Sequence, residues 1–261
     1  MKREIINIVL LGSGNVATHL GLHLSKAGYK IVQVYSRTEN NARELADRLK
    51  TTYTSDPDQI NQQADLYLIS VKDDSIATVA SHKSLENKIL VHTSGSIKAG
   101  VFEPYTAEYG VFYPFQTFSK LREVSFKNIP VLVEASTADL ENELLKLAKK
   151  LSEKVLKADS DQRAMLHISA VFACNFTNHM YAIADDLLKN SGLSFDLLKP
   201  LITETAEKVM IMNPADAQTG PAVRFDTNIM DQQMTKLNDE PVYREIYRKM
   251  SESIQNLQKK K

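Results

Sequence analysis

The first part of the chain alternates between short apolar runs and amphipathic stretches. Residues 5–11 form a nearly continuous, β-branched apolar run, which is typical of a strand buried on both faces of a parallel sheet. Similar runs predict further strands at 31–35, 66–71, 89–92, 111–113, 131–134 and 155–157. Helical patterns lie at 15–26, 39–50, 75–81 and 138–150. This alternation predicts a doubly wound parallel α/β sheet.

From residue 160 onward the pattern is only helical. Residues 161–190 contain no Gly or Pro and are followed by Ser191-Gly192, so they predict one long helix. Further helical patterns follow near 195–212, 228–237 and 242–258. We therefore expect two domains, an α/β domain over residues 1–158 and an all-helical domain over residues 159–261.

Composition narrows the possible partners and the compartment. The chain has 261 residues with 32 Lys+Arg and 32 Asp+Glu, so its formal net charge is zero. This balance gives no electrostatic reason to expect nucleic acid or an anionic membrane as a partner. The only cysteine is Cys174, which excludes an intrachain disulfide and fits a reducing compartment. No apolar run approaches the ~18–20 residues of a membrane helix, and we expect a cytoplasmic protein.

The turn after the first predicted strand carries the most specific motif. Gly12-Ser13-Gly14-Asn15-Val16-Ala17 fits G-x-G-x-x-A and lies between an apolar strand and a helix. Gly12 permits the tight turn, Gly14 lets the backbone approach a pyrophosphate, and Ala17 keeps the helix near the sheet. The start of the helix supplies free N–H donors. The motif predicts a Rossmann domain that binds a dinucleotide; a structural turn in an empty domain is the alternative.

The end of the second predicted strand selects the cofactor. NAD-binding domains usually place an Asp or Glu there to bond the ribose 2′-hydroxyl. This chain has Ser36 and Arg37 instead. Arginine grips a 2′-phosphate through paired N–H groups, and no carboxylate repels it. We therefore predict NADP(H) as the cofactor, with a solvated surface role for Arg37 as the alternative.

Ligands of open α/β sheets collect beyond the carboxyl ends of the strands. Val71, Lys72, Ser94 and Gly95 lie at the carboxyl ends of two predicted strands and are expected to contact the cofactor. Small residues such as Ser94 and Gly95 let a flat nicotinamide ring lie close to the backbone. Tyr113 ends another strand and is a candidate substrate contact. Each of these segments alone is equally well explained as a plain loop.

The long helix carries further candidates. On a regular α-helix, His167, Asn175 and Asn178 lie on one polar stripe beside an apolar face, and the two Asn side chains are one turn apart. We expect His167 to donate a proton and Asn175 and Asn178 to grip the substrate. The alternatives are a packing histidine and asparagines that bond the neighbouring backbone.

Arg224 and the pair His19 and His23 are less specific indications of a binding site. Arg224 follows a Gly-Pro loop and is a candidate carboxylate or phosphate ligand, with pairing to a surface acid as an equal alternative. His19 and His23 have the spacing of a metal pair, but no third ligand is near in sequence, so we expect no metal site.

Taken together, these segments resemble the Rossmann-like proteins with a DUF2520 C-terminal domain, which are similar to the coenzyme F420-dependent NADP oxidoreductases. The likeness extends over essentially the whole chain. More distantly, the layout is similar to ketopantoate reductase, pyrroline-5-carboxylate reductase and the 3-hydroxyacid dehydrogenases. The segments that carry it are 12–17, 71–73, 92–96, 113–118, 167–175 and 219–224.

The chain departs from these families at three positions. In ketopantoate reductase and the hydroxyacid enzymes a Lys precedes the Asn that Asn175 matches, and Val171 occupies that place. Tyr113 stands where the DUF2520 proteins often have His, and Phe225 where they often have Gly. The ammonium acid of the distant relatives is therefore missing.

The resemblance implies an NADP-dependent oxidoreductase that transfers a hydride between NADP(H) and a small carbonyl or imine, in a cleft between the two domains. A non-catalytic NADP-binding sensor or interaction protein is the alternative, and Val171 is its main support. We also expect a homodimer through the helical domain, because apolar helix faces there need cover. Arg224 would then reach the partner's cleft.

Overall fold

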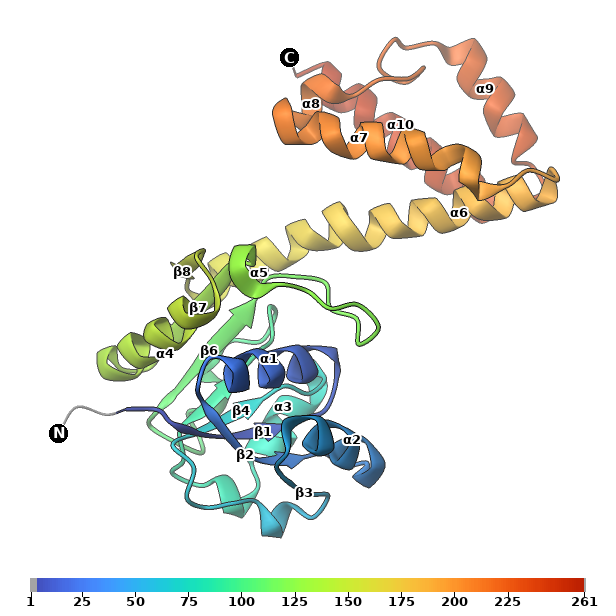
Figure 1. Cartoon of the computed structure of the whole chain (residues 1–261). Coiled ribbons are helices and arrows are strands. Elements are labelled where there is room, and N and C mark those ends of the chain that lie inside the picture. Colours follow the sequence, from blue (N-terminus) through green and yellow to red (C-terminus); the bar gives the residue numbers. More distant parts are fainter. Residues whose placement is uncertain (1–3, 261) are drawn as a thin grey trace. The chain divides into compact units, whose positions relative to one another are not determined.

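The computed structural model describes residues 4–260 and divides into two compact units (Figure 1). One unit ends at Cys174 and the other begins at Asn175. The sequence prediction placed the boundary between residues 158 and 159. The difference arises from helix α5 (Ser160–Ala170), whose buried Arg163 is bonded to Ser94 and Glu134 of the first unit.

An eight-stranded sheet organises the first unit, in the order β3-β2-β1-β4-β5-β6-β7-β8. Strands β1 to β6 are parallel, β7 runs antiparallel to β6, and β8 is parallel to β7. The doubly wound sheet is thus confirmed. The sequence did not predict β3, which is a short and partly polar edge strand. The strands are β1 (Asn7–Leu11), β2 (Lys30–Tyr35), β3 (Thr52–Thr54), β4 (Leu66–Ile69), β5 (Leu90–His92), β6 (Tyr109–Pro114), β7 (Val131–Ala135) and β8 (Val155–Lys157).

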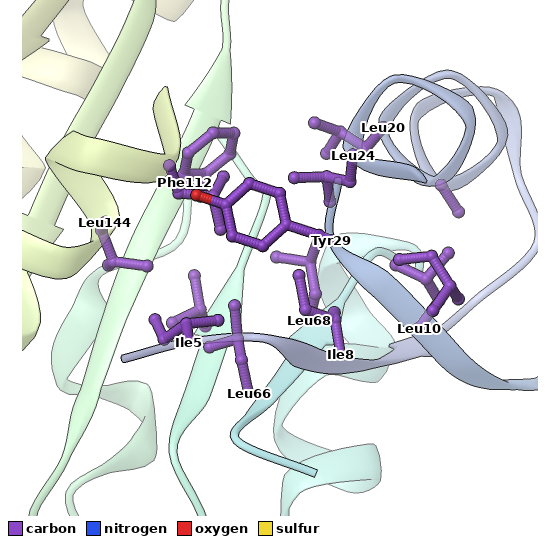
Figure 2. Packing of buried hydrophobic residues seen from close by; sticks show 14 of the residues in the cluster. Ile5, Ile8, Leu10, Leu20, Leu24, Tyr29, Leu66, Leu68, Phe112 and Leu144 are labelled. Atoms are coloured by element: carbon purple, nitrogen blue, oxygen red, sulfur yellow. The ribbon is translucent and has the colours of Figure 1, made fainter. Parts of the chain in front are cut away.

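Both faces of the sheet are buried, as the continuous apolar runs predicted. Ile8 and Leu10 of β1 belong to a cluster that includes residues of α1, α2 and α4 (Figure 2). Val9 and Leu11 belong to a second cluster that includes residues of α3. The helices of this part are α1 (Asn15–Lys26), α2 (Glu39–Leu49), α3 (Ile76–Ala80) and α4 (Ala138–Leu151).

The long helix predicted over residues 161–190 is interrupted. It begins with a capping box, in which Asp159 and Gln162 each bond the other's backbone, and continues as α5. A π-helical turn over Val171–Phe176 then precedes α6 (Thr177–Asn190). Because a π-turn bonds i to i+5, the angles that a regular helix would give Asn175 and Asn178 relative to His167 do not apply. The prediction of one regular α-helix was therefore wrong, and the polar stripe stays a prediction.

The second unit is helical throughout its described residues. After α6 it contains α7 (Lys199–Ile211), α8 (Pro214–Ala217), α9 (Thr227–Lys236) and α10 (Pro241–Gln258). Only Ala222 and Met230 are buried among the residues described in this unit. Across residues 4–260, no helix is long and apolar enough to cross a membrane. Short 3-10 helices occur at Pro57–Gln59, Asp73–Ser75, Lys83–Leu85, Ala99–Phe102, Phe126–Asn128 and Phe195–Leu198.

Candidate active site

A cavity of about 560 Å³ lies at the carboxyl ends of the parallel strands in the first unit. Its size lies within the range of ligand pockets, and its place on the sheet is where α/β folds bind nucleotides. The structure brings together here every residue that the sequence predicted to contact the cofactor. These residues are Gly12, Ser13, Gly14, Asn15, Val16, Ser36, Arg37, Val71, Lys72, Ser94 and Gly95.

The glycine turn leaves room for a ligand rather than for protein atoms. Gly12 has φ +125°, and a Cβ there would lie 2.1 Å from the carbonyl oxygen of Ser70, so the fold itself requires glycine. A Cβ on Gly14 would meet no protein atom within 4 Å. Gly14 is also the N-cap of α1, and no side chain caps this helix start. The open space and the helix N–H groups together fit a phosphate group.

The end of β2 presents hydroxyl and cationic groups to the cavity. The Ser13 hydroxyl donates to the Ser36 hydroxyl over 2.9 Å, which joins the glycine turn to the start of the Arg37 segment. Thr38 and Asn41 also line this end, although the sequence did not single them out. The nearest acid, Glu39, is 2.9 Å from Arg43. A 2′-phosphate would therefore meet Arg37 without an adjacent unpaired carboxylate.

Tyr113, Gly95 and His167 meet at the other end of the cavity. The Tyr113 hydroxyl lies 2.8 Å from Nδ1 of His167, within hydrogen-bond distance. A Cβ on Gly95 would lie 2.6 Å from that Nδ1 and 2.8 Å from Cζ of Tyr113. Gly95 is therefore required where it stands, because the two side chains occupy the space a larger residue would fill.

Burial shifts the pKa values of Tyr113 and His92, at and near this end of the cavity. Burial raises the pKa of Tyr113 to about 12, so it remains a phenol at neutral pH, while the charge of Arg163 opposes this rise and Asp73 adds to it. Burial and the Arg163 charge lower the pKa of His92 to about 3. His92 is thus neutral, and its Nδ1 accepts a hydrogen bond from the Ser94 backbone over 3.1 Å.

Arg163 was missed by the sequence reasoning. Its side chain is 1% exposed, and it donates to the carbonyl oxygens of Ser94 and Ile97 and pairs with Glu134. The only sequence feature that could have indicated it is its position one helical turn before His167. A single sequence does not distinguish such a residue from a solvated arginine, because Ser94, Ile97 and Glu134 are each more than 25 residues away in the sequence.

The remaining predicted residues belong to the second unit. All residues described as lining the cavity lie in the first unit, whereas Asn175, Asn178 and Arg224 lie in the second, so their part in the site stays a prediction. Next to Arg224, Phe225 has φ +55°, a left-handed conformation that glycine adopts most readily. This backbone fits the glycine that the family resemblance implies at that place.

His19 and His23 of α1 lie within hydrogen-bond distance of backbone carbonyl oxygens. His19 Nε2 lies 2.9 Å from the Ser119 carbonyl oxygen, and His23 Nδ1 lies 2.9 Å from the His19 carbonyl oxygen. Within the described part of the chain, no three His, Cys, Asp or Glu side chains are grouped to hold a metal ion.

Two family models match successive parts of the chain, and the second match begins within the first structural unit. Residues 7–95 match the family described as NADP oxidoreductase, coenzyme F420-dependent. Residues 129–254 match the domain of unknown function DUF2520. No curated protein matches the chain.

Solved structures extend the likeness over nearly the full length. A proposed NADP oxidoreductase from Bacteroides fragilis is 48% identical, with a TM-score of 0.91, over 97% of this chain and 98% of that one. A protein from Thermotoga maritima is 21% identical, with a TM-score of 0.72, over 97% and 98%. An imine reductase from Myxococcus stipitatus, solved with NADP+, is 12% identical, with a TM-score of 0.66, over 96% and 93%. The last two show the shared fold.

Proposed function

Because the chain belongs to the family of NADP oxidoreductases with a Rossmann domain and a DUF2520 domain, we propose that it is an NADP-dependent reductase of a small carbonyl or imine compound. The observation that carries this proposal is the single cavity that joins the glycine turn to the Tyr113–His167 pair. A dinucleotide site and a proton-donating pair in one cavity are the two requirements of a hydride-transfer enzyme.

The residues around the cavity fit NADP(H). The N–H groups at Gly14 and the start of α1 would hold the pyrophosphate, and Ser36 and Arg37 would hold the 2′-phosphate. Val71, Lys72 and Gly95 would line the nicotinamide end. When bound, NADPH supplies the hydride.

His167 and Tyr113 supply what the hydride alone does not, a proton for the substrate oxygen or nitrogen. With Nδ1 directed at the Tyr113 hydroxyl, Nε2 is the imidazole atom left to face a ligand. In the imidazolium form, Nδ1–H donates to the tyrosine oxygen and Nε2–H passes to the substrate. The imidazole ends neutral, and the substrate gains one hydride and one proton.

A second candidate function is a non-catalytic NADP-binding sensor. Val171 favours it, because the chain lacks the lysine of the distantly similar reductases. Fluorescence titration with NADPH, followed by absorbance at 340 nm in the presence of pooled small carbonyl and imine compounds, separates the two. Binding with steady NADPH oxidation supports the reductase. Binding with no oxidation across the panel supports the sensor, and no binding contradicts both.

A further inference from the structure

Arg163 is a buried charged residue of the first unit, and its guanidinium bonds the segment after β5 and strand β7. Its Nε donates to the Ser94 carbonyl oxygen over 3.1 Å, and another guanidinium nitrogen donates to the carbonyl oxygen of Ile97. A third nitrogen pairs with Glu134 on β7. Ser160 completes the cluster, since its hydroxyl lies 2.9 Å from both oxygens of Glu134.

Each partner of Arg163 is directly connected to a member of the candidate active site. In the segment that follows β5, Ser94 is adjacent to Gly95 and Ile97 lies two residues after it. Glu134 pairs in register with Val111 of β6, two residues before Tyr113. Arg163 itself precedes His167 by one turn of α5. The Arg163 guanidinium therefore connects the three parts of the chain that position Gly95, Tyr113 and His167.

We propose that Arg163 is the positioning residue of this site, and that it holds α5 against the Ser94–Ile97 segment so that His167 meets the Tyr113 hydroxyl across Gly95. The inference rests on the proposed function only in treating that pair as the proton donor. The geometric part, that Arg163 sets the His167–Tyr113 contact, stands whether or not the protein turns over NADPH.

Fold stability alone does not account for a buried ion pair of this kind. Removing two charges from water offsets much of their attraction, and apolar residues of similar size often stabilise a core equally well. What apolar side chains lack is the planar fork that directs hydrogen bonds to fixed carbonyl oxygens. Arg163 uses that fork on two carbonyl oxygens and one carboxylate. Its charge also opposes the effect of burial on the pKa of Tyr113.

The test is the double variant Arg163→Met/Glu134→Leu, which removes both charges and leaves neither one unpaired. The matched control is Lys127→Met/Glu153→Leu, which removes an exposed Lys–Glu pair from the same unit. Arg163→Lys keeps the charge without the fork and serves as a second, less disruptive variant. The first readout is the ring ¹⁵N spectrum of the histidines, of which the chain has six. The His167 signals are assigned from His167→Ala, and Tyr113→Phe defines their shift when the hydrogen bond is lost.

We expect the double variant to unfold at or above the wild-type temperature while its His167 signals move to the Tyr113→Phe position. Arg163→Lys should show part of that shift. With a substrate, kcat should fall at least about tenfold and the KM for NADPH should change by less than about threefold. The control should match wild type in all three measurements.

Wild-type His167 signals in both Arg163 variants would overturn the positioning role, as would a loss of kcat matched by an equal loss of folded protein. If wild type binds NADPH but reduces no substrate, the proposed function fails, and the histidine spectrum still decides the role of Arg163.

Discussion

Tyr113 and His167 are 54 positions apart in the sequence, yet the tyrosine hydroxyl lies 2.8 Å from Nδ1 of the histidine. The pair brings β6 and α5 together above Gly95, at the end of the cavity away from Arg37. Since one imidazole nitrogen is engaged, the ring is held in one orientation. A histidine held in this way suits proton donation better than a freely rotating surface side chain.

His167→Ala should therefore lower kcat by about 10²-fold or more while the affinity for NADPH changes little. The substitution removes the proton donor but leaves the glycine turn and the Arg37 segment intact. Tyr113→Phe should have a smaller effect on kcat, because it removes the orienting hydroxyl and keeps the imidazole. Steady-state kinetics and NADPH fluorescence titration on the same preparations measure both quantities. Full activity of His167→Ala would leave that residue a packing role only.

Two glycines of the same turn should respond differently to alanine. Gly14→Ala should weaken NADPH binding by at least about tenfold with little change in the free energy of unfolding, because its Cβ would meet no protein atom. Gly12→Ala should instead destabilise the fold, by about 2 kcal/mol or more, since its Cβ would meet the Ser70 carbonyl group and its φ is positive. Urea unfolding and cofactor titration of both variants separate these effects. Unchanged NADPH affinity in Gly14→Ala would contradict a pyrophosphate at this turn.

We expect the preference for NADPH over NADH to depend on Arg37. We expect NADPH to bind at least tenfold more tightly than NADH, a difference of about 1.4 kcal/mol, because Ser36 and Arg37 replace the acid that bonds a free ribose hydroxyl. Arg37→Ala should remove most of that difference by weakening NADPH and leaving NADH nearly unchanged. Titrations of both proteins with both cofactors give the four constants required. Equal wild-type constants would show that Arg37 is only a surface residue.

The sequence predicted the residues of the glycine turn and of the Arg37 segment, which line the cavity, but it did not predict Arg163. The glycine turn and the Arg37 segment are local, since each motif lies within a few residues of the strand that positions it. Arg163 and its contacts depend on pairing between β6 and β7 and on the docking of α5, which no local pattern reports. The π-turn at Val171–Phe176 was missed for another reason, namely that its residues are as compatible with a regular helix.

Acid should destabilise the first unit through His92. Its pKa is about 3 in the folded protein against an ordinary value of 6.5, so below pH 6.5 the unfolded chain binds a proton that the folded chain does not. The stabilisation is complete above pH 6.5 and is lost as the pH falls toward 3, at about 1.4 kcal/mol per pH unit. Urea unfolding of wild type and His92→Asn at several pH values should show a shallower dependence in the variant. The same substitution at the more exposed His82 is the control, and identical slopes for wild type and His92→Asn would contradict this account.

The exposed apolar surface of the second unit predicts that the chain associates with a second copy of itself. Met210 and Ile211 are 80% and 84% exposed, and only Ala222 and Met230 are buried among the described residues of this unit. A helical unit with so small a core needs further apolar contacts, and a second copy of the chain is the simplest source. We therefore propose a homodimer through this unit, with a mass by light scattering near twice the 29.3 kDa of the chain.

Leu201→Glu on α7 should then shift the mass toward the monomer, whereas the control Leu121→Glu, at a fully exposed leucine of the first unit, should not. A wild-type mass near 29.3 kDa at micromolar concentration would show a monomer and contradict the proposed homodimer. Arg224 tests whether the copies also share a site. If it reaches the partner's cavity, Arg224→Ala should remain dimeric but bind ligand more weakly, because a cation able to hold a carboxylate or phosphate is lost. A dimeric variant that binds normally would keep the assembly and remove Arg224 from the site.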